Sequence, residues 1–151
     1  MKFPLGLAYR AIPVILAGMA LFALACQPKA RVEKPPQLTP DEALFSSAES
    51  DFGAGNYARA MKAYERYLEH FPKGPNAKTA LYRISQIFTY GYDYEKALAA
   101  LKNFLREYPG DPQASVVEYD MARLYYRLGD YERSRLTAIE WIGRYPDHPH
   151  L

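Results

Sequence analysis

A repeat of 37 residues constrains this chain more than any other feature of its sequence. Three stretches align at this interval without a gap, and similar residue types recur in the same columns. Repetition at such a period indicates an array of small units, each of which buries its apolar face against the next. The recurring columns hold Asn56, Asp93 and Asp130; Tyr57, Tyr94 and Tyr131; Ala48, Ser85 and Ala122; Phe71-Pro72, Tyr108-Pro109 and Tyr145-Pro146; and Pro75, Pro112 and Pro149.

Each unit is predicted to be a pair of helices. The first pair opens at Thr39, because Pro40 suits the first helical position and Glu42 completes a capping box. Later first helices are predicted to open at Gly74-Pro75 and Asp111-Pro112, and first helices to end near Gly53, Gly91 and Gly129. Second helices are predicted to start at Asn56, Asp93 and Asp130, whose side chains can accept first-turn amide protons, and to stop at the aromatic–proline pairs.

Apolar residues within the second helices follow helical spacing, which predicts one buried face on each. The stripes are Tyr57, Ala60, Met61, Tyr64 and Leu68, and then Tyr94, Ala97, Leu98, Leu101 and Leu105. The predicted fold is therefore all-α, an α-solenoid of three helix-turn-helix repeats over residues 39–74, 75–111 and 112–148. A domain of 39–151 would be incomplete at its C-terminal end, because a fourth first helix is expected to begin at Leu151.

The columns resemble the tetratricopeptide repeat, whose usual period is 34 residues. Three additional residues lie between each closing proline and the next first helix, as in Lys73-Gly74-Pro75. The family's small residue falls on Ala48, Ser85 and Ala122 and again on Ala60, Ala97 and Ser134, and its aromatic residue falls on Phe88 and Tyr125 but on Asp51 in the first unit. The resemblance implies a protein-binding scaffold and not an enzyme.

The N-terminal 25 residues have the layout of a secretory signal peptide. Lys2 and Arg10 form a charged start, and an uncharged, mostly apolar run of 15 residues, 11 to 25, precedes Cys26. That run is shorter than the roughly 20 residues that span a bilayer.

The stretch Ala23-Leu24-Ala25-Cys26 resembles a bacterial lipobox, in which the cysteine thiol is acylated. The family prefers a large aliphatic residue and then a small one, whereas Ala23 and Leu24 have the opposite order. An ordinary signal peptide with an incidental cysteine is the alternative. If Cys26 is lipidated, Gln27 implies sorting to the periplasmic side of the outer membrane, and the polar, proline-containing residues 26–38 would be a disordered tether.

The remaining chain offers no chemistry for catalysis, and no cofactor is expected. Without Lys2 and Arg10 it carries 19 − 2 = 17 basic and 17 acidic residues, so electrostatics give no argument for nucleic acid. The single cysteine excludes an internal disulfide or cysteine cluster. His70, His148 and His150 lie at helix ends or in the tail, without the further ligands that a metal site needs.

In the tetratricopeptide family, one face of the first helices lines a concave groove. The matching columns are aromatic, which predicts a surface for an extended or helical peptide with apolar side chains. Its members are Phe45, Tyr82 and Tyr119; Phe52 and Tyr126; and the adjacent Tyr90. The alternative is that these rings pack against the neighbouring second helix. Clamping of an acidic tail is not expected, because the clamp positions hold Glu49, Gln86 and Arg123.

A lipid-anchored array of this kind resembles three kinds of bacterial envelope protein. The first is the repeat lipoprotein of the β-barrel assembly machinery, and the second is the repeat region of an outer-membrane activator of peptidoglycan synthases. The third, a soluble coordinator of cell division, fits less well. The expected partners are therefore a β-barrel assembly subunit or a peptidoglycan synthase. The alternative is that a ligand-binding or enzymatic domain after Leu151 carries out the function. Trp141 is interpreted as a core residue at the open end of the array in preference to a binding hot spot.

Overall fold

The computed structural model describes residues 37–148, which form six α-helices of 14 residues each and no strand. The helices are α1 (Pro40–Gly53), α2 (Tyr57–His70), α3 (Ala77–Tyr90), α4 (Tyr94–Glu107), α5 (Ala114–Arg127) and α6 (Tyr131–Arg144). Within this part of the chain, no helix has the length and apolar character needed to cross a membrane.

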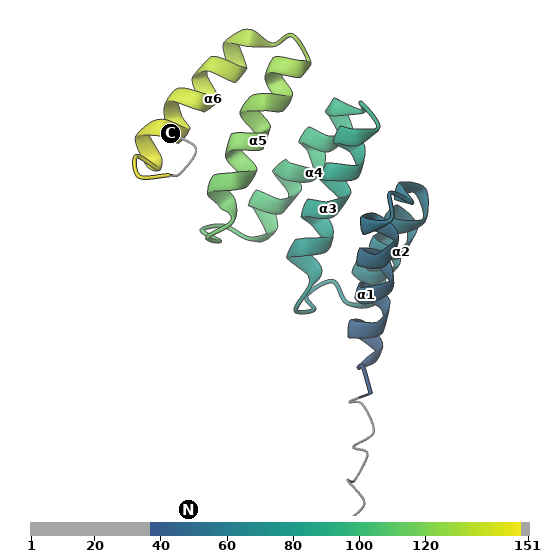
Figure 1. Ribbon diagram of the computed structural model, residues 1–151. Helices are drawn as coiled ribbons and strands as arrows, with labels where there is room; N and C mark the ends of the chain where they lie inside the picture. Colours follow the sequence, from purple (N-terminus) through teal and green to yellow (C-terminus); the bar gives the residue numbers. More distant parts are fainter. Residues whose placement is uncertain (1–36, 149–151) are drawn as a thin grey trace, which may run out of the picture. The chain divides into compact units, whose positions relative to one another are not determined.

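The six helices form three pairs that repeat at the predicted interval. First helices begin at Pro40, Ala77 and Ala114, and second helices at Tyr57, Tyr94 and Tyr131, so both series advance by 37 residues. Each helix packs against its neighbours in sequence, so α2 and α4 each contact two first helices. The three pairs follow one another along the array in Figure 1. The predicted all-α, tetratricopeptide-like array is therefore confirmed.

The starts of the first helices are correct in one repeat and require correction in two. The capping box of α1 is present, because the Thr39 hydroxyl accepts from the Glu42 amide and the Glu42 carboxylate accepts from the Thr39 amide. In contrast, α3 and α5 begin two residues after Pro75 and Pro112. A tight turn comes first, in which the amide of the first helical residue donates to the carbonyl three residues earlier, at Gly74 and at Asp111.

Two of the three predicted caps of the second helices are formed. The carboxylates of Asp93 and Asp130 accept hydrogen bonds from the amides three residues later, at 3.3 and 3.0 Å. Asn56 does not cap α2, because its side-chain amide is turned toward the Asp51 carboxylate at 3.4 Å. The predicted start of α2 at Asn56 is therefore correct, but the predicted side-chain cap is not formed.

The core follows the small-residue columns. Ala48, Ala60 and Ala97 are fully buried, which allows the helices of a pair to approach closely. The predicted stripes missed Tyr67 and Phe104, which are also fully buried. A second helix contacts the first helix of its own pair and that of the next, so its buried arc is wider than a single stripe.

Tyr67 also shapes the junction between the first and second repeats. Its hydroxyl oxygen accepts a hydrogen bond from the Asn76 amide at 3.1 Å, which satisfies a backbone donor just before α3. A Cβ atom at Gly74 would lie 2.6 Å from this oxygen, so the close approach requires glycine. The junction between the first and second repeats thus depends on a turn that needs Gly74 and Tyr67 together.

Candidate protein-binding site on the first helices

The first predicted column holds rings that pack largely onto second helices. Phe45 is half-buried, with its ring centroid 5.5 Å from that of Tyr67. Tyr119 is half-buried in the same way, 5.2 Å from the ring of Trp141 in α6. At these two positions the contacts are those of the alternative interpretation, in which the rings pack against a neighbouring helix.

The second group of rings comes together between the first and second repeats. Tyr90 is 49% exposed and stacks on Tyr57, with 5.0 Å between centroids and 30° between planes. Phe52 lies 6.1 Å from Tyr90, and the Arg83 guanidinium covers the face of Phe52 at 4.5 Å. Phe52 and Tyr90 therefore belong to one aromatic cluster that is partly open to solvent.

Arg83 also joins the first two repeats through an ion pair. Its Nε and Nη2 atoms donate to the two carboxylate oxygens of Glu49 at 2.9 and 3.0 Å, and Tyr64 donates a third hydrogen bond to the same carboxylate. Burial alone would raise the pKa of Glu49, but the hydrogen bonds from Arg83 and Tyr64 and the Arg83 charge together lower it. Burial and the Glu49 carboxylate raise the pKa of Tyr64, so its hydroxyl stays protonated.

The substitution Glu49→Gln is expected to lower the free energy of unfolding by about 1 kcal/mol at pH 7, because a charge-assisted, half-exposed pair is lost. The lowered folded-state pKa stabilises the protein above the unfolded value near 4.5, and this contribution disappears as the pH falls through the folded-state pKa. Urea unfolding of both proteins at pH 7 and pH 3 measures the effect. Glu65→Gln, on an exposed position of α2, is the control. An equal difference between wild type and Glu49→Gln at both pH values would contradict this assignment.

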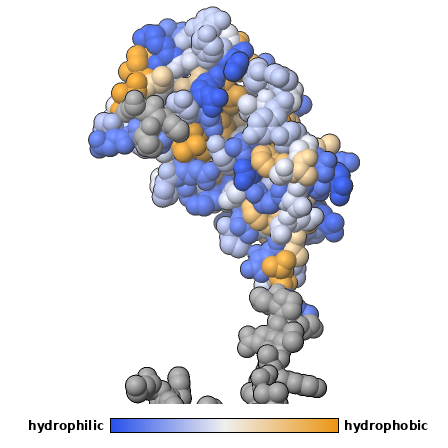
Figure 2. Space-filling model, in the orientation of Figure 1, coloured by the Kyte–Doolittle hydropathy of each residue, from blue (hydrophilic) through white to orange (hydrophobic). Residues whose placement is uncertain are grey.

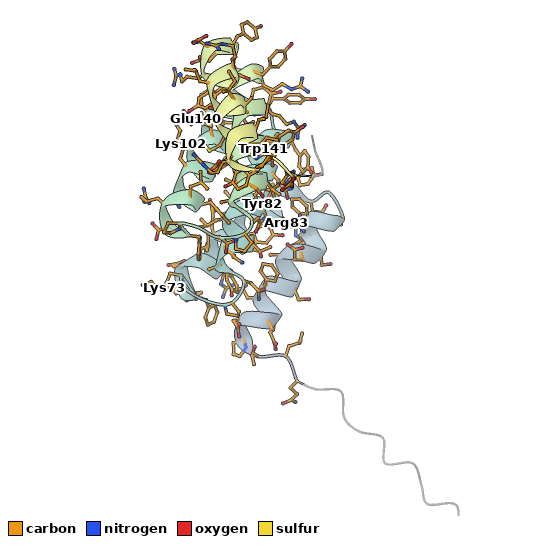
Figure 3. All side chains as sticks on the ribbon, turned by 90° about the vertical axis from the view of Figure 1, so that its left-hand side faces the viewer. Lys73, Tyr82, Arg83, Lys102, Glu140 and Trp141 are labelled. Carbon is orange, nitrogen blue, oxygen red and sulfur yellow. The ribbon has the colours of Figure 1, made fainter. Side chains whose placement is uncertain are left out.

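Tyr82 lines a cleft between α3 and α5. Its hydroxyl donates to Asp120 Oδ2 at 2.7 Å, and Arg123 donates to the other oxygen of this carboxylate at 3.1 Å. Burial and the Asp120 charge raise the pKa of Tyr82, so the hydroxyl remains a donor. Tyr82 and Arg83 are adjacent on α3, labelled in Figure 3, and serve the cleft and the ion pair respectively.

The cleft beside Tyr82 has a volume of about 550 Å³ and is called here the Tyr92 cleft. First helices α3 and α5 flank it, and Leu101 of α4 contributes to its lining. The residues that line it include Tyr82, Tyr90, Tyr92, Tyr94, Asp120, Arg123 and Arg127. The arrangement offers aromatic faces, hydrogen-bonding groups and cations to a bound segment.

A second cleft, of about 500 Å³, lies between α5 and α6. Tyr119, Tyr126 and Trp141 line it, and Tyr126 is 62% exposed. Trp141 itself is buried and donates from its indole nitrogen to the Ser115 carbonyl at 2.6 Å, as a core residue does. Hydrophobic residues reach the surface over α6 in Figure 2. Leu136, Ile139 and Ile142 of this helix are exposed.

The six predicted groove residues therefore take different places. Tyr82 and Tyr90 share the first cleft, Tyr119 and Tyr126 share the second, Phe52 touches Tyr90, and Phe45 lines neither cleft. Their role in peptide binding remains a prediction. Cys26, the predicted lipidation site, lies outside the described residues.

Sequence reasoning missed Tyr92, Tyr94 and Arg127 as residues of the first cleft. A signal for Tyr92 exists in the repeat register, because the same column holds Gly55 and Gly129 in the other two repeats. Tyr94 belongs to a column that was assigned to packing. No comparable signal marks Arg127, since exposed arginines are common at helix ends.

A comparison with protein families identifies a related family. A family model, YfiO, described as an outer membrane lipoprotein, matches residues 37–119 and residues 78–151. Two overlapping matches are expected when a sequence repeats internally. No curated protein shows a significant sequence match to the chain.

Proposed function

Because the chain belongs to the YfiO family of outer-membrane lipoproteins, we propose that it is a non-enzymatic interaction scaffold that serves the assembly of β-barrel proteins. The family description supports a location at the outer membrane and a protein-interaction role. The proposal adds that an acyl group on Cys26 holds it at the periplasmic face. Residues 26–38 would then tether the helical array close to that surface.

The observation that carries the scaffold proposal is the pair of clefts along the first helices. Both are lined by tyrosines that the fold leaves partly exposed, namely Tyr90 in the first and Tyr126 in the second. Tyrosine gives a large contact area at low entropic cost, and such side chains concentrate binding energy at protein interfaces. Among residues 37–148, no group of three or more acidic, histidine or cysteine residues is arranged to bind a metal ion.

Photocrosslinking in cells tests the proposal. Tyr90 is replaced by a photoreactive phenylalanine analogue, which keeps an aromatic ring in the first cleft. Crosslinked proteins are purified under denaturing conditions and identified by mass spectrometry. We expect a subunit of the β-barrel assembly machinery. A peptidoglycan synthase would instead favour the alternative, a repeat region of a synthase activator, and the absence of any specific protein would contradict the scaffold.

A further inference from the structure

Tyr92 has a backbone conformation that its side chain disfavours. Its φ is +61°, in the left-handed region that β-carbon sterics make costly for residues other than glycine. The equivalent residues of the other repeats are Gly55 and Gly129, with φ of +75° and +77°. The turn between the helices of a pair thus needs a left-handed residue, and only the second repeat meets this need with a large side chain.

The fold does not offset this strain by burying the ring. Tyr92 is 78% exposed, and its ring lies edge-on to the ring of Tyr94, with 6.2 Å between the centroids. The side chain instead lies at the margin of the Tyr92 cleft, as does half-exposed Tyr90. Strained residues of this kind persist mainly at functional sites. The free-energy cost of the left-handed conformation at Tyr92 therefore indicates that its side chain contacts a ligand.

The charges in the cleft indicate the type of ligand. Asp120 uses both carboxylate oxygens internally, one for Tyr82 and one for Arg123. Arg127 lines both this cleft and the cleft between α5 and α6, and it has no hydrogen-bond or ion-pair partner among residues 37–148. One negative charge is thus set against two positive charges, and the unpaired cation is near exposed tyrosine rings. A planar guanidinium favours a carboxylate, and the rings favour an aromatic or large apolar group.

We propose that the Tyr92 cleft binds a protein segment in which an acidic side chain is next to an aromatic or large apolar side chain. Arg127 pairs with the carboxylate, and Tyr90 and Tyr92 contact the neighbouring side chain. A volume of about 550 Å³ is within the range of sites that enclose a small ligand or a few side chains. This inference rests on the proposed scaffold function and specifies the chemistry of its partner.

The opposite effects of one substitution on stability and binding give a sharp test. Tyr92→Gly is expected to raise the melting temperature of the full-length protein by about 3 °C, because the strain is relieved. The same change is expected to weaken binding at least tenfold. The probe is a fluorescein-labelled peptide of twelve residues, selected by phage display against the wild-type protein. Each library peptide is joined at its C-terminus to the coat protein, so no free terminal carboxylate takes part in the selection. Binding is measured by fluorescence polarisation.

Two further comparisons separate the contribution of the Arg127 charge to binding from that of the tyrosine rings. Arg127→Gln is expected to weaken binding of the selected peptide about tenfold. It is expected to have little effect on binding of a peptide in which Asn replaces the acidic residue. Tyr131→Ala and Arg66→Gln remove an exposed tyrosine and an exposed arginine outside the cleft, and binding is expected to be unchanged. These controls show whether the loss of peptide binding results from changes within the cleft.

Several results would overturn the inference. They are selection of peptides without an acidic–apolar pair, failure to select any peptide, or full binding by Tyr92→Gly. Self-association of the wild type that the same variants abolish would assign the cleft to a second copy instead. If photocrosslinking from position 90 still captures an envelope protein, only the acidic–aromatic specificity fails and the scaffold proposal stands.

Discussion

The substitution Phe104→Ala is expected to lower the free energy of unfolding by about 4 kcal/mol. Phe104 is fully buried on α4, within a cluster that includes Leu101, Val117 of α5 and Leu124 of α5. Its removal leaves a cavity between two helix pairs, and the array has few other contacts to compensate because each repeat touches only its neighbours. Urea unfolding followed by circular dichroism at 222 nm measures the change.

The control for this prediction is on the same helix. Lys102→Ala removes a long side chain from the exposed side of α4, labelled in Figure 3, and is expected to change stability by no more than about 0.5 kcal/mol. A loss below about 1 kcal/mol for Phe104→Ala would mean that α4 does not pack between α3 and α5 as described.

The substitution Cys26→Ser is expected to remove the protein from the membrane almost completely. An acyl chain contributes about 0.8 kcal/mol per buried methylene, and several chains together give stable anchoring. A serine hydroxyl is close in size to the thiol but does not accept the lipid. Metabolic labelling with a fatty-acid analogue should mark the wild type and leave Cys26→Ser unlabelled, with at least a tenfold fall in the membrane fraction.

The chain provides its own control for this experiment. Cys26 is the only cysteine, so no other thiol can take up the label. Gln27→Ser changes the adjacent residue and is expected to keep both the label and the membrane association. Equal labelling of wild type and Cys26→Ser would refute lipidation at this residue.

The helix pairs could be predicted from the sequence because the 37-residue register repeats most of the helix-start and helix-end signals three times. Aromatic–proline pairs mark the ends of α2, α4 and α6 correctly, since proline cannot continue a helix. The starts of α3 and α5 were less predictable. Proline before a helix suits either a first helical position or a preceding turn, and here the turn is formed around Gly74 and Asp111.

The candidate site was less predictable than the fold, because it depends on contacts between repeats. No pattern within one repeat shows that Tyr82 donates to Asp120, 38 residues later. Nor does periodicity distinguish a ring that packs on its own pair, such as Phe45, from one that remains exposed, such as Tyr126. The sequence shows that Tyr92 occupies a column that holds glycine in the other two repeats. Only the positive φ of Tyr92 in the structure shows that this residue is strained.

The most direct test of the scaffold compares photocrosslinking from two positions in the same cells. One photoreactive residue replaces Tyr90, in the Tyr92 cleft, and the other replaces Lys102, on the exposed side of α4. We expect a specific envelope protein to be crosslinked from position 90 and only background crosslinking from position 102. Equal crosslinking from both positions, or crosslinking from position 102 alone, would contradict binding through the first helices.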